Sequence, residues 1–215
     1  MKVCVLGTGD VGKALGKGFI ALGHDVMMGS RSATNEKALA WAKEVGPKAS
    51  VGTFTDAASF GDIVVLATLG TANEEALKAA RPEKLKGKLV IDATNPLDFS
   101  GGMPPKLGIV GNDSGGERVQ KLLPGAHVVK AFNTVGNSAM YRPEFPGGPP
   151  DMFIAGNDDD AKKKVNGILK DFGWGTVHDL GGIEASRYLE AMCMVWVLSG
   201  SRGGHWNQAF KLLRA

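Results

Sequence analysis

Three glycines near the start of the chain have the spacing of a phosphate-binding turn. The six residues that contain them are Gly7-Thr8-Gly9-Asp10-Val11-Gly12. An apolar run precedes them and apolar residues with helical spacing follow, so the turn would join a strand to a helix. There, Gly7 permits a tight turn, Gly9 lets the backbone approach a pyrophosphate, and Gly12 lets helix and strand pack closely. The helix N-terminus would offer free N–H groups to the phosphates, which predicts a dinucleotide site.

The end of the second expected strand indicates which dinucleotide the turn would bind. A site for NAD usually has an acidic residue here, which binds the ribose 2′-hydroxyl, whereas this chain has Ser30-Arg31-Ser32. An acid would repel a 2′-phosphate, while a guanidinium flanked by two hydroxyls would bind it through charge-assisted hydrogen bonds. We therefore predict NADP(H) as the cofactor.

Three further strand ends carry small or amide-bearing residues. The candidates are Thr68 and Leu69, Asn95 and Pro96, and Ala131 and Asn133. In an open α/β sheet, ligands bind outside the carboxyl ends of the strands. Because these residues follow successive strands, we expect them to line the part of the cleft that holds the nicotinamide, its ribose and its carboxamide.

Residues able to donate a proton are scarce at these strand ends. None of the four histidines follows one of them, and only His205 is kept as a site candidate. Lys130 lies within an expected strand, where we interpret it as a stem packed on apolar neighbours. Reduction of a carbonyl or imine needs a proton donor as well as a hydride. Hydride transfer between a nicotinamide and a flavin-like ring needs only that two planar rings be oriented, so the sequence favours a planar acceptor and assigns no catalytic residue.

The acidic run Asn157-Asp158-Asp159-Asp160 invites comparison with a metal site. Three lysines and a helical apolar pattern follow it, and the run has no EF-hand spacing. Acids in that position complement the helix dipole and cap its first turn. We predict a helix start here and no metal.

Short β-type runs alternate with helical patterns along the chain, which indicates parallel strands joined by crossover helices. We predict an α/β fold: a Rossmann-like, doubly wound, mainly parallel sheet with a short C-terminal helical extension. The expected strands are 2–6, 25–28, 49–52, 63–67, 89–92, 128–130, 152–155 and 176–180. The expected helices begin near residues 11, 36, 71, 114, 159 and 183, with capping boxes at Thr71 and Glu74 and at Ser114 and Glu117. The Gly- and Pro-rich segments 98–113 and 141–150 are expected either to wall the site or to be plain connections.

The chain divides into an NADP-binding domain, residues 1–180, and a helical extension, residues 181–215. Only about 35 residues follow the last strand, too few for the helical substrate domain that many dehydrogenases add to this fold. Residues 192–198 are apolar on all sides, which predicts a helix that is buried on two opposite faces. We expect the extension to pack on the sheet or on a partner subunit, and we favour a homodimer over burial within one chain.

Composition excludes several other classes of protein. The formal net charge of +3 over 215 residues is small and evenly spread, which argues against a nucleic-acid partner. No apolar run approaches the ~20 residues that span a bilayer, and the first residues do not form a signal peptide. The two cysteines, Cys4 and Cys193, form neither a zinc pattern nor a disulfide framework. We expect a cytoplasmic protein with no membrane partner.

Six segments of the chain together resemble a known family: residues 7–12, 29–31, 92–96, 128–133, 155–158 and 179–181. In them the chain resembles the NADPH-dependent oxidoreductases that act on the deazaflavin coenzyme F420, and it is similar to the cytosolic domains of the STEAP metalloreductases. The resemblance implies NADP(H) bound by Thr8 through Gly12 and by Ser30 and Arg31, with a flavin-type ring stacked on the nicotinamide near Thr68, Asn95 and Asn133.

The chain departs from the deazaflavin enzymes at two places. Those enzymes carry a histidine where this chain has Asn133, and segment 141–150 is inserted. Three functions therefore stay open. The first is hydride transfer between NADPH and a deazaflavin or flavin. The second is reduction of a small carbonyl or imine, with His205 or a water as proton donor. The third is a non-catalytic NADPH sensor.

Overall fold

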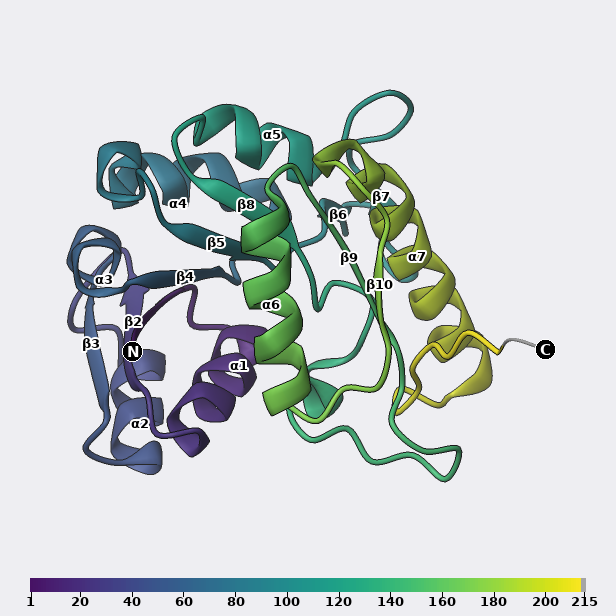
Figure 1. The fold of residues 1–215 in the computed structure, drawn as a ribbon, viewed down its shortest axis with the longest axis horizontal. Helices are drawn as coiled ribbons and strands as arrows, with labels where there is room; N and C mark the ends of the chain where they lie inside the picture. Colours follow the sequence, from purple (N-terminus) through teal and green to yellow (C-terminus); the bar gives the residue numbers. More distant parts are fainter. Residues whose placement is uncertain (214–215) are drawn as a thin grey trace.

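A mainly parallel sheet forms the centre of the molecule, with helices on both of its faces (Figure 1). The computed structural model describes residues 1–213, and within them the sheet has eight strands in the order β10-β9-β8-β5-β4-β1-β2-β3. Strands β9 and β10 run antiparallel to the other six. The bounds are β1 (Lys2–Leu6), β2 (Asp25–Ser30), β3 (Ala49–Thr53), β4 (Ile63–Leu66), β5 (Leu89–Asp92), β8 (His127–Lys130), β9 (Met152–Gly156) and β10 (Val177–Asp179). The predicted Rossmann-like fold is confirmed.

Helices cover each face of the sheet because its strands are apolar on both sides. In β1, Val3 and Val5 pack in one core while Cys4 and Leu6 pack in the other, following the two-residue period of a strand. The first core is covered by α1 (Asp10–Ala21), α2 (Glu36–Val45) and α6 (Asp159–Asp171). The second is covered by α3 (Phe54–Phe60), α4 (Asn73–Ala80) and α5 (Gly115–Leu122). Short 3-10 turns lie at Gly70–Ala72, Pro82–Lys84, Asn137–Ala139 and Ile183–Ala185.

Side chains cap most of these helices at the N-terminus. Asn35, Thr53, Ser114 and Asp158 accept backbone N–H groups of α2, α3, α5 and α6. The cap by Asp158 confirms that run 157–160 starts a helix. The capping box predicted for residues 71 and 74 is wrong, because α4 starts at Asn73 after a 3-10 turn and has no side-chain cap.

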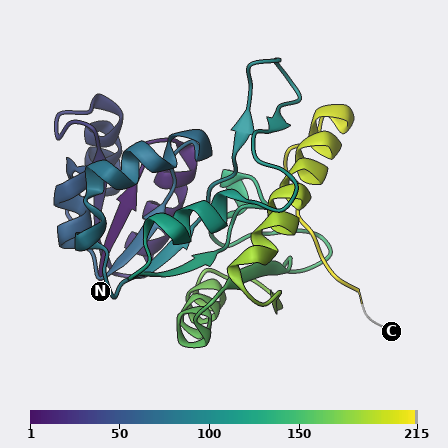
Figure 2. The ribbon, with the colours of Figure 1, turned by 90° about the horizontal axis from the view of Figure 1, so that it is seen from above.

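The last helix, α7 (Ser186–Gly203), lies at one end of the molecule beside the hairpin of β6 (Leu97–Asp98) and β7 (Lys106–Leu107), as Figure 2 shows. It packs on α5, β7 and β9, and Trp196 also bonds to Gln208 of the C-terminal segment, which leaves a stripe of the helix exposed. Residues 192–198 are therefore not buried all round: Cys193 and Val197 are buried, but Val195 is 58% exposed and Leu198 is 38% exposed. None of the helices among residues 1–213 has the length and apolar character needed to cross a membrane.

Candidate functional site

The glycines of the turn after β1 differ in their surroundings: Gly7 and Gly12 lie against backbone atoms, and Gly9 faces open space. Gly7 has a φ of +124°, and a Cβ there would lie 2.4 Å from the Ala67 carbonyl oxygen. A Cβ on Gly12 would lie 2.4 Å from the carbonyl oxygen of Gly7. A Cβ on Gly9 would meet no atom within 4 Å. The fold thus excludes a side chain at Gly7 and Gly12, while the surface over Gly9 stays bare for a ligand.

The first turn of α1 also keeps its backbone groups available. Its N-cap is Gly9, and no side chain caps it, in contrast to α2, α3, α5 and α6. An uncapped N-terminus presents N–H groups and a partial positive charge to an anion. Both features fit the diphosphate of a dinucleotide cofactor.

The turn after β2 presents Arg31. Ser30 ends the strand, and its buried hydroxyl accepts from the Ser32 N–H at 3.2 Å and donates to the Ser32 carbonyl at 2.6 Å. The hydroxyls of Ser32 and Thr34 are 2.8 Å apart. Arg31 itself is exposed, with no ion pair among residues 1–213. Ser30 and Ser32 therefore hold the turn that displays the guanidinium.

These two turns open on one cleft of about 590 Å³. It lies where the strand order reverses, between the carboxyl ends of β1 and β4, which is where doubly wound sheets bind ligands. The predicted residues that line it are Gly7, Thr8, Gly9, Ser30, Arg31, Ser32, Thr68 and Leu69. Sequence reasoning missed the remaining lining residues. Most belong to α3, to α4 or to the 3-10 turn before α4, and the full set is Asn35, Phe54, Ala67, Ala72, Glu75, Ala76 and Ala79. The spacing of Thr53 and Asp56, which form a capping box in the structure, is the sequence signal that could have identified α3.

The other predicted residues lie outside this cleft. Asp10 is exposed, and its carboxylate is 4.0 Å from the Lys13 ammonium. Val11 packs against the first core and Ala131 is fully buried in it. Pro96 lines a separate hollow of about 220 Å³ between α4, α5 and the β6–β7 hairpin.

Asn95 and Asn133, at the ends of the neighbouring strands β5 and β8, hydrogen-bond to each other. Asn95 Nδ2 donates to the Asn133 carbonyl oxygen at 2.8 Å, and Asn133 Nδ2 donates to Asn95 Oδ1 at 2.9 Å. Asn133 Nδ2 also donates to the Leu189 carbonyl of α7 at 3.0 Å. Asn133 Oδ1 is buried and has no hydrogen-bond partner within residues 1–213.

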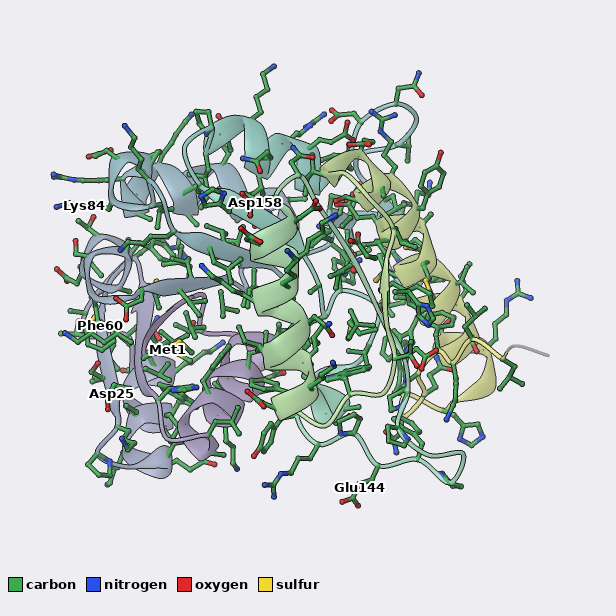
Figure 3. All side chains as sticks on the ribbon, viewed as in Figure 1. Met1, Asp25, Phe60, Lys84, Glu144 and Asp158 are labelled. Atoms are coloured by element: carbon green, nitrogen blue, oxygen red, sulfur yellow. The ribbon has the colours of Figure 1, made fainter. Side chains whose placement is uncertain are left out.

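The two Gly- and Pro-rich segments differ in their relation to the site. Gly108 and Ile109 of segment 98–113 line the hollow beside Pro96. Segment 141–150 contributes nothing to the cleft: Tyr141 packs on Phe172 after α6, and Gly147 accepts a hydrogen bond from Lys211. Figure 3 labels Glu144 of this segment at the edge of the molecule, near the end of α6 and far from Asp158 at its start. The interpretation of 141–150 as a wall of this cleft is wrong.

Lys130 is the main correction to the sequence analysis. It is not a stem with its charge in solvent but is fully buried, and its ammonium has three partners. These are Asp92 Oδ2 at 2.9 Å, Glu190 Oε1 at 2.8 Å and the Thr94 carbonyl oxygen at 2.8 Å. We call Asp92, Lys130 and Glu190 the buried triad. From the sequence, a lysine in an apolar strand cannot be distinguished from one whose stem packs on apolar neighbours. The reason is that its ionic partners lie 38 and 60 residues away along the chain.

The triad is charged and fully hydrogen-bonded. Burial by itself lowers the pKa of Lys130, but Asp92 and Glu190 more than offset this and hold the pKa above its ordinary value. Glu190 also accepts from the N–H groups of Gly115 and Gly116 at the start of α5. All three ammonium protons are used, so Lys130 does not serve as a proton donor to a substrate.

Other titratable groups are no better placed for acid–base chemistry. His205 is exposed and lines no part of the cleft. His178 is bound to Asp151, 2.8 Å away, and His127 lies 2.9 Å from Asp158. Burial raises the pKa of Cys193 to about 12 and that of Cys4 further still, so both thiols are neutral at physiological pH.

Comparison with known proteins places the chain in a family. Residues 2–96 match the family model described as "NADP oxidoreductase coenzyme F420-dependent". The chain is 32% identical to the F420-dependent NADP reductase of Methanocaldococcus jannaschii, over 89% of both chains. It is 31% identical to the enzyme of the same name from Methanothermobacter marburgensis, over 88% of both chains. The chain belongs to the family of F420-dependent NADP reductases.

Other proteins are similar to this chain in sequence or in fold. The rat metalloreductase STEAP3 is 27% identical over 89% of this chain, which corresponds to 36% of that protein. A crystal structure from Arthrobacter sp. FB24 matches with a TM-score of 0.95 and 40% identity, covering 100% of both chains. An imine reductase of Streptomyces aurantiacus matches with a TM-score of 0.65 and 18% identity, over 94% of this chain and 64% of that one. At that identity the last match shows the fold alone.

Proposed function

We propose that this member of the family binds NADP(H) in the 590 Å³ cleft and transfers hydride between its nicotinamide and the deazaflavin coenzyme F420. The observation that carries the proposal is the cleft at the switch point, which joins an uncapped helix N-terminus to an exposed arginine. When bound, NADPH supplies the hydride from its nicotinamide ring. The protein holds the diphosphate at the turn 7–12 and the 2′-phosphate at Arg31.

The assignment of NADP(H) over NAD(H) rests on the turn after β2. Arg31 is exposed there, and no carboxylate from that turn lines the cleft. A free guanidinium can bind a phosphate through two parallel hydrogen bonds. The diphosphate needs no side chain, since backbone N–H groups and the helix dipole bind it.

The absence of a placed proton donor supports a planar acceptor. All three protons of the Lys130 ammonium are engaged within the protein. One carboxylate, that of Glu75, lines the cleft, and it belongs to an exposed residue of α4. Hydride transfer between carbon atoms of two stacked rings requires orientation rather than a protein acid, because a ring nitrogen of the reduced deazaflavin can take its proton from solvent. A carbonyl or imine substrate would require a proton from a group that residues 1–213 do not place at the cleft.

We also infer that two copies of the chain pair through α7. Tyr188, Ala191, Val195 and Leu198 form a stripe along the exposed face of this helix, and we call them the α7 stripe. The stripe holds no charged side chain, so two copies can pack about a twofold axis without burying charge. The supporting observation is that these residues are apolar or aromatic and, within one chain, uncovered.

The domain bounds and the cellular compartment of the protein are also proposals. We propose a cofactor domain over residues 1–180 with an extension over 181–215, although Glu190 of the extension reaches the centre of the sheet. Both cysteines are unpaired, and we infer a reducing compartment such as the cytoplasm.

Parallel assays of NADPH oxidation, followed at about 340 nm, test the acceptor. The acceptors are coenzyme F420, FMN, FAD, a ferric chelate and a small cyclic imine. We expect turnover with F420 and at least tenfold less with the others. Faster turnover of the imine would replace the deazaflavin with a small substrate. Tight NADPH binding with no turnover on any acceptor would favour a sensor.

A further inference from the structure

A continuous chain of hydrogen bonds connects the buried triad to the cofactor cleft. Asp92 Oδ1 accepts from the hydroxyl of Thr94 at 2.7 Å and from the Thr94 N–H at 3.0 Å. Thr94 Oγ1 accepts from Asn73 Nδ2 at 2.7 Å. Asn73 Oδ1 accepts from the Thr68 hydroxyl at 2.6 Å. The chain starts at residues with at most 1% exposure and ends at Thr68, which lines the cleft beside Gly7 and Gly9.

The charge of the triad gives this chain one direction. The Asp92 carboxylate lies 2.9 Å from the Lys130 ammonium, and a carboxylate paired in this way accepts hydrogen bonds and donates none. The Thr94 hydroxyl therefore donates to Asp92, because a charge-assisted bond is about twice as strong as a neutral one. Because the hydroxyl proton of Thr94 is engaged in that bond, its oxygen acts as an acceptor for the Asn73 amide N–H.

The direction then passes to the cleft through an amide that has only two ways to face. Because the Asn73 Nδ2 group is turned to Thr94, its Oδ1 is turned to Thr68. The single proton of the Thr68 hydroxyl is thereby used inside the protein. A ligand meets only the lone pairs of this oxygen, so a phosphate oxygen gains nothing there and an N–H or O–H group does.

We propose that Asp92, Lys130 and Glu190 are positioning residues that fix Thr68 as a hydrogen-bond acceptor for a donor group on the nicotinamide half of the cofactor. Two groups there are donors, the carboxamide N–H and the hydroxyls of the nicotinamide ribose. The inference rests on the proposed binding of NADP(H) in this cleft and adds which of its groups Thr68 contacts. Glu190 and Lys130 act through Asp92 and touch no ligand themselves.

The test compares four ligands with the wild-type protein and with Thr68→Val and Thr68→Ser, by calorimetry on the full chain. The ligands are NADP⁺, its 3-acetylpyridine analogue, 2′-phospho-ADP-ribose and 2′,5′-ADP. The analogue lacks the carboxamide N–H, the third ligand lacks the nicotinamide, and the fourth lacks the second ribose. We expect Thr68→Val to weaken NADP⁺ about threefold to tenfold, the loss of one hydrogen bond, with Thr68→Ser close to wild type.

The pattern across ligands identifies the donor. A loss confined to NADP⁺ assigns the carboxamide N–H, and a loss shared by the first three ligands assigns a ribose hydroxyl. Either pattern supports the proposal. An equal loss with 2′,5′-ADP, or no loss with any ligand, overturns it. If the wild-type protein does not bind NADP⁺ at all, the proposed function fails instead. Where it does bind, Arg31→Ala is the positive control, because all four ligands carry the 2′-phosphate and should weaken alike.

A second comparison tests the role of the triad. Asp92→Asn lets an amide meet Thr94 either way round, and Asn73→Ala cuts the chain one step from Thr68, so each leaves the Thr68 hydroxyl undirected. In both backgrounds we expect the added Thr68→Val change to cost less than half of its wild-type factor in NADP⁺ affinity. If Asp92→Asn does not fold, Asn73→Ala carries the test alone. The same factor in every folded background would reduce the triad to a structural role.

Discussion

Arg31 and Gly9 contribute to the cleft in opposite ways, one by a side chain and one by lacking it. The guanidinium stands exposed at the end of β2, on a turn held by Ser30, where it has freedom to meet a phosphate. Gly9 leaves a surface that no Cβ obstructs, where we propose that the diphosphate lies. In this proposal both residues serve the ligand and contribute little to the fold, so substitutions at them should separate binding from stability.

Arg31→Ala is expected to weaken NADPH binding by about 1.5–3 kcal/mol, the range for hydrogen bonds to a charged group. NADH has no 2′-phosphate, so its affinity should hardly change. Arg31→Lys is the matched control: it keeps the charge but not the planar fork, and it should fall between the two. Calorimetry with both cofactors measures this. Equal weakening of NADPH and NADH would contradict the placement of the 2′-phosphate.

Gly9→Ala and Gly12→Ala make a second contrast. A methyl group at Gly9 meets open space, so the free energy of unfolding should change by less than about 1 kcal/mol while NADPH affinity falls at least tenfold. A methyl group at Gly12 meets the Gly7 carbonyl oxygen at 2.4 Å, so unfolding should become easier by about 1–3 kcal/mol. Urea denaturation without cofactor measures both variants. Comparable destabilisation by both would show that Gly9 is needed for the fold.

At the scale of elements, one buried side chain connects three of them. Glu190 of α7 accepts from the first N–H groups of α5 and lies 2.8 Å from Lys130 of β8. A carboxylate at a helix N-terminus is favourable, and here the same carboxylate also neutralises a buried ammonium. The extension after residue 180 is therefore attached to the sheet by charge as well as by apolar packing.

Glu190→Ala is expected to destabilise the protein by about 3–5 kcal/mol, because it leaves a buried ammonium with one counter-charge and two N–H groups without a partner. The control is Arg187→Ala. Arg187 makes two hydrogen bonds to Glu117 in a partly buried pair, and its loss leaves no fully buried charge, so it should cost clearly less than Glu190→Ala. Urea unfolding of both variants gives the comparison. Similar losses would mean that the triad contributes no more than this partly buried pair.

Asp151 makes the attachment of the C-terminal segment depend on pH. It accepts from His178, from the Thr176 N–H and from the Leu212 N–H. Burial raises the pKa of Asp151, but these hydrogen bonds outweigh it and hold the pKa below its usual range. A lowered pKa in the folded state gives stability that is present above the unfolded pKa of about 4 and is lost as the pH falls through the folded value.

Asp151→Asn should therefore unfold at lower urea than wild type at pH 6, and the two midpoints should converge below about pH 4. Proteolysis by trypsin at Lys211 gives an independent reading, since the variant should be cut faster at neutral pH. A gap between the midpoints that widens in acid would show that Asp151 is not the group responsible.

At the scale of the whole molecule, the uncovered α7 stripe is the feature that a single chain leaves unexplained. Tyr188 is 72% exposed and Val195 is 58% exposed, and both belong to a helix whose other face is buried. Contiguous apolar patches of this kind commonly mark interfaces between proteins. Pairing of two α7 helices would cover them.

Val195→Asp is expected to convert the proposed dimer to a monomer, because pairing would bury two carboxylates close to each other. Sedimentation velocity of wild type and variant measures the change. Leu39→Asp is the matched control, an exposed leucine on α2 that lies outside the stripe and should leave the mass unchanged. A monomeric wild-type protein would rule out pairing through α7.

Local sequence signals identified most of the fold and located the turns that line the cleft. The glycine turn, the Arg31 turn and the strand end at Thr68 could be located because each follows an apolar strand within a few residues. Boundaries were harder: β2 extends to Ser30, and α4 begins at Asn73 because its side chain is held by Thr68 and Thr94. Helix α3 and its cleft residues were missed because residues 54–60 have little helical periodicity.

By its sequence alone this protein is a phosphate-binding α/β fold with an arginine where NAD sites have an acid, since glycine spacing and strand periodicity are local properties of a chain. Only the tertiary structure decided the state of Lys130, because its partners Asp92 and Glu190 are distant in sequence and meet it only when β5, β8 and α7 pack together. The same packing directs the hydroxyl of Thr68 and leaves one face of α7 uncovered. Those properties depend on which groups share a dry interior, and that is set by the fold as a whole.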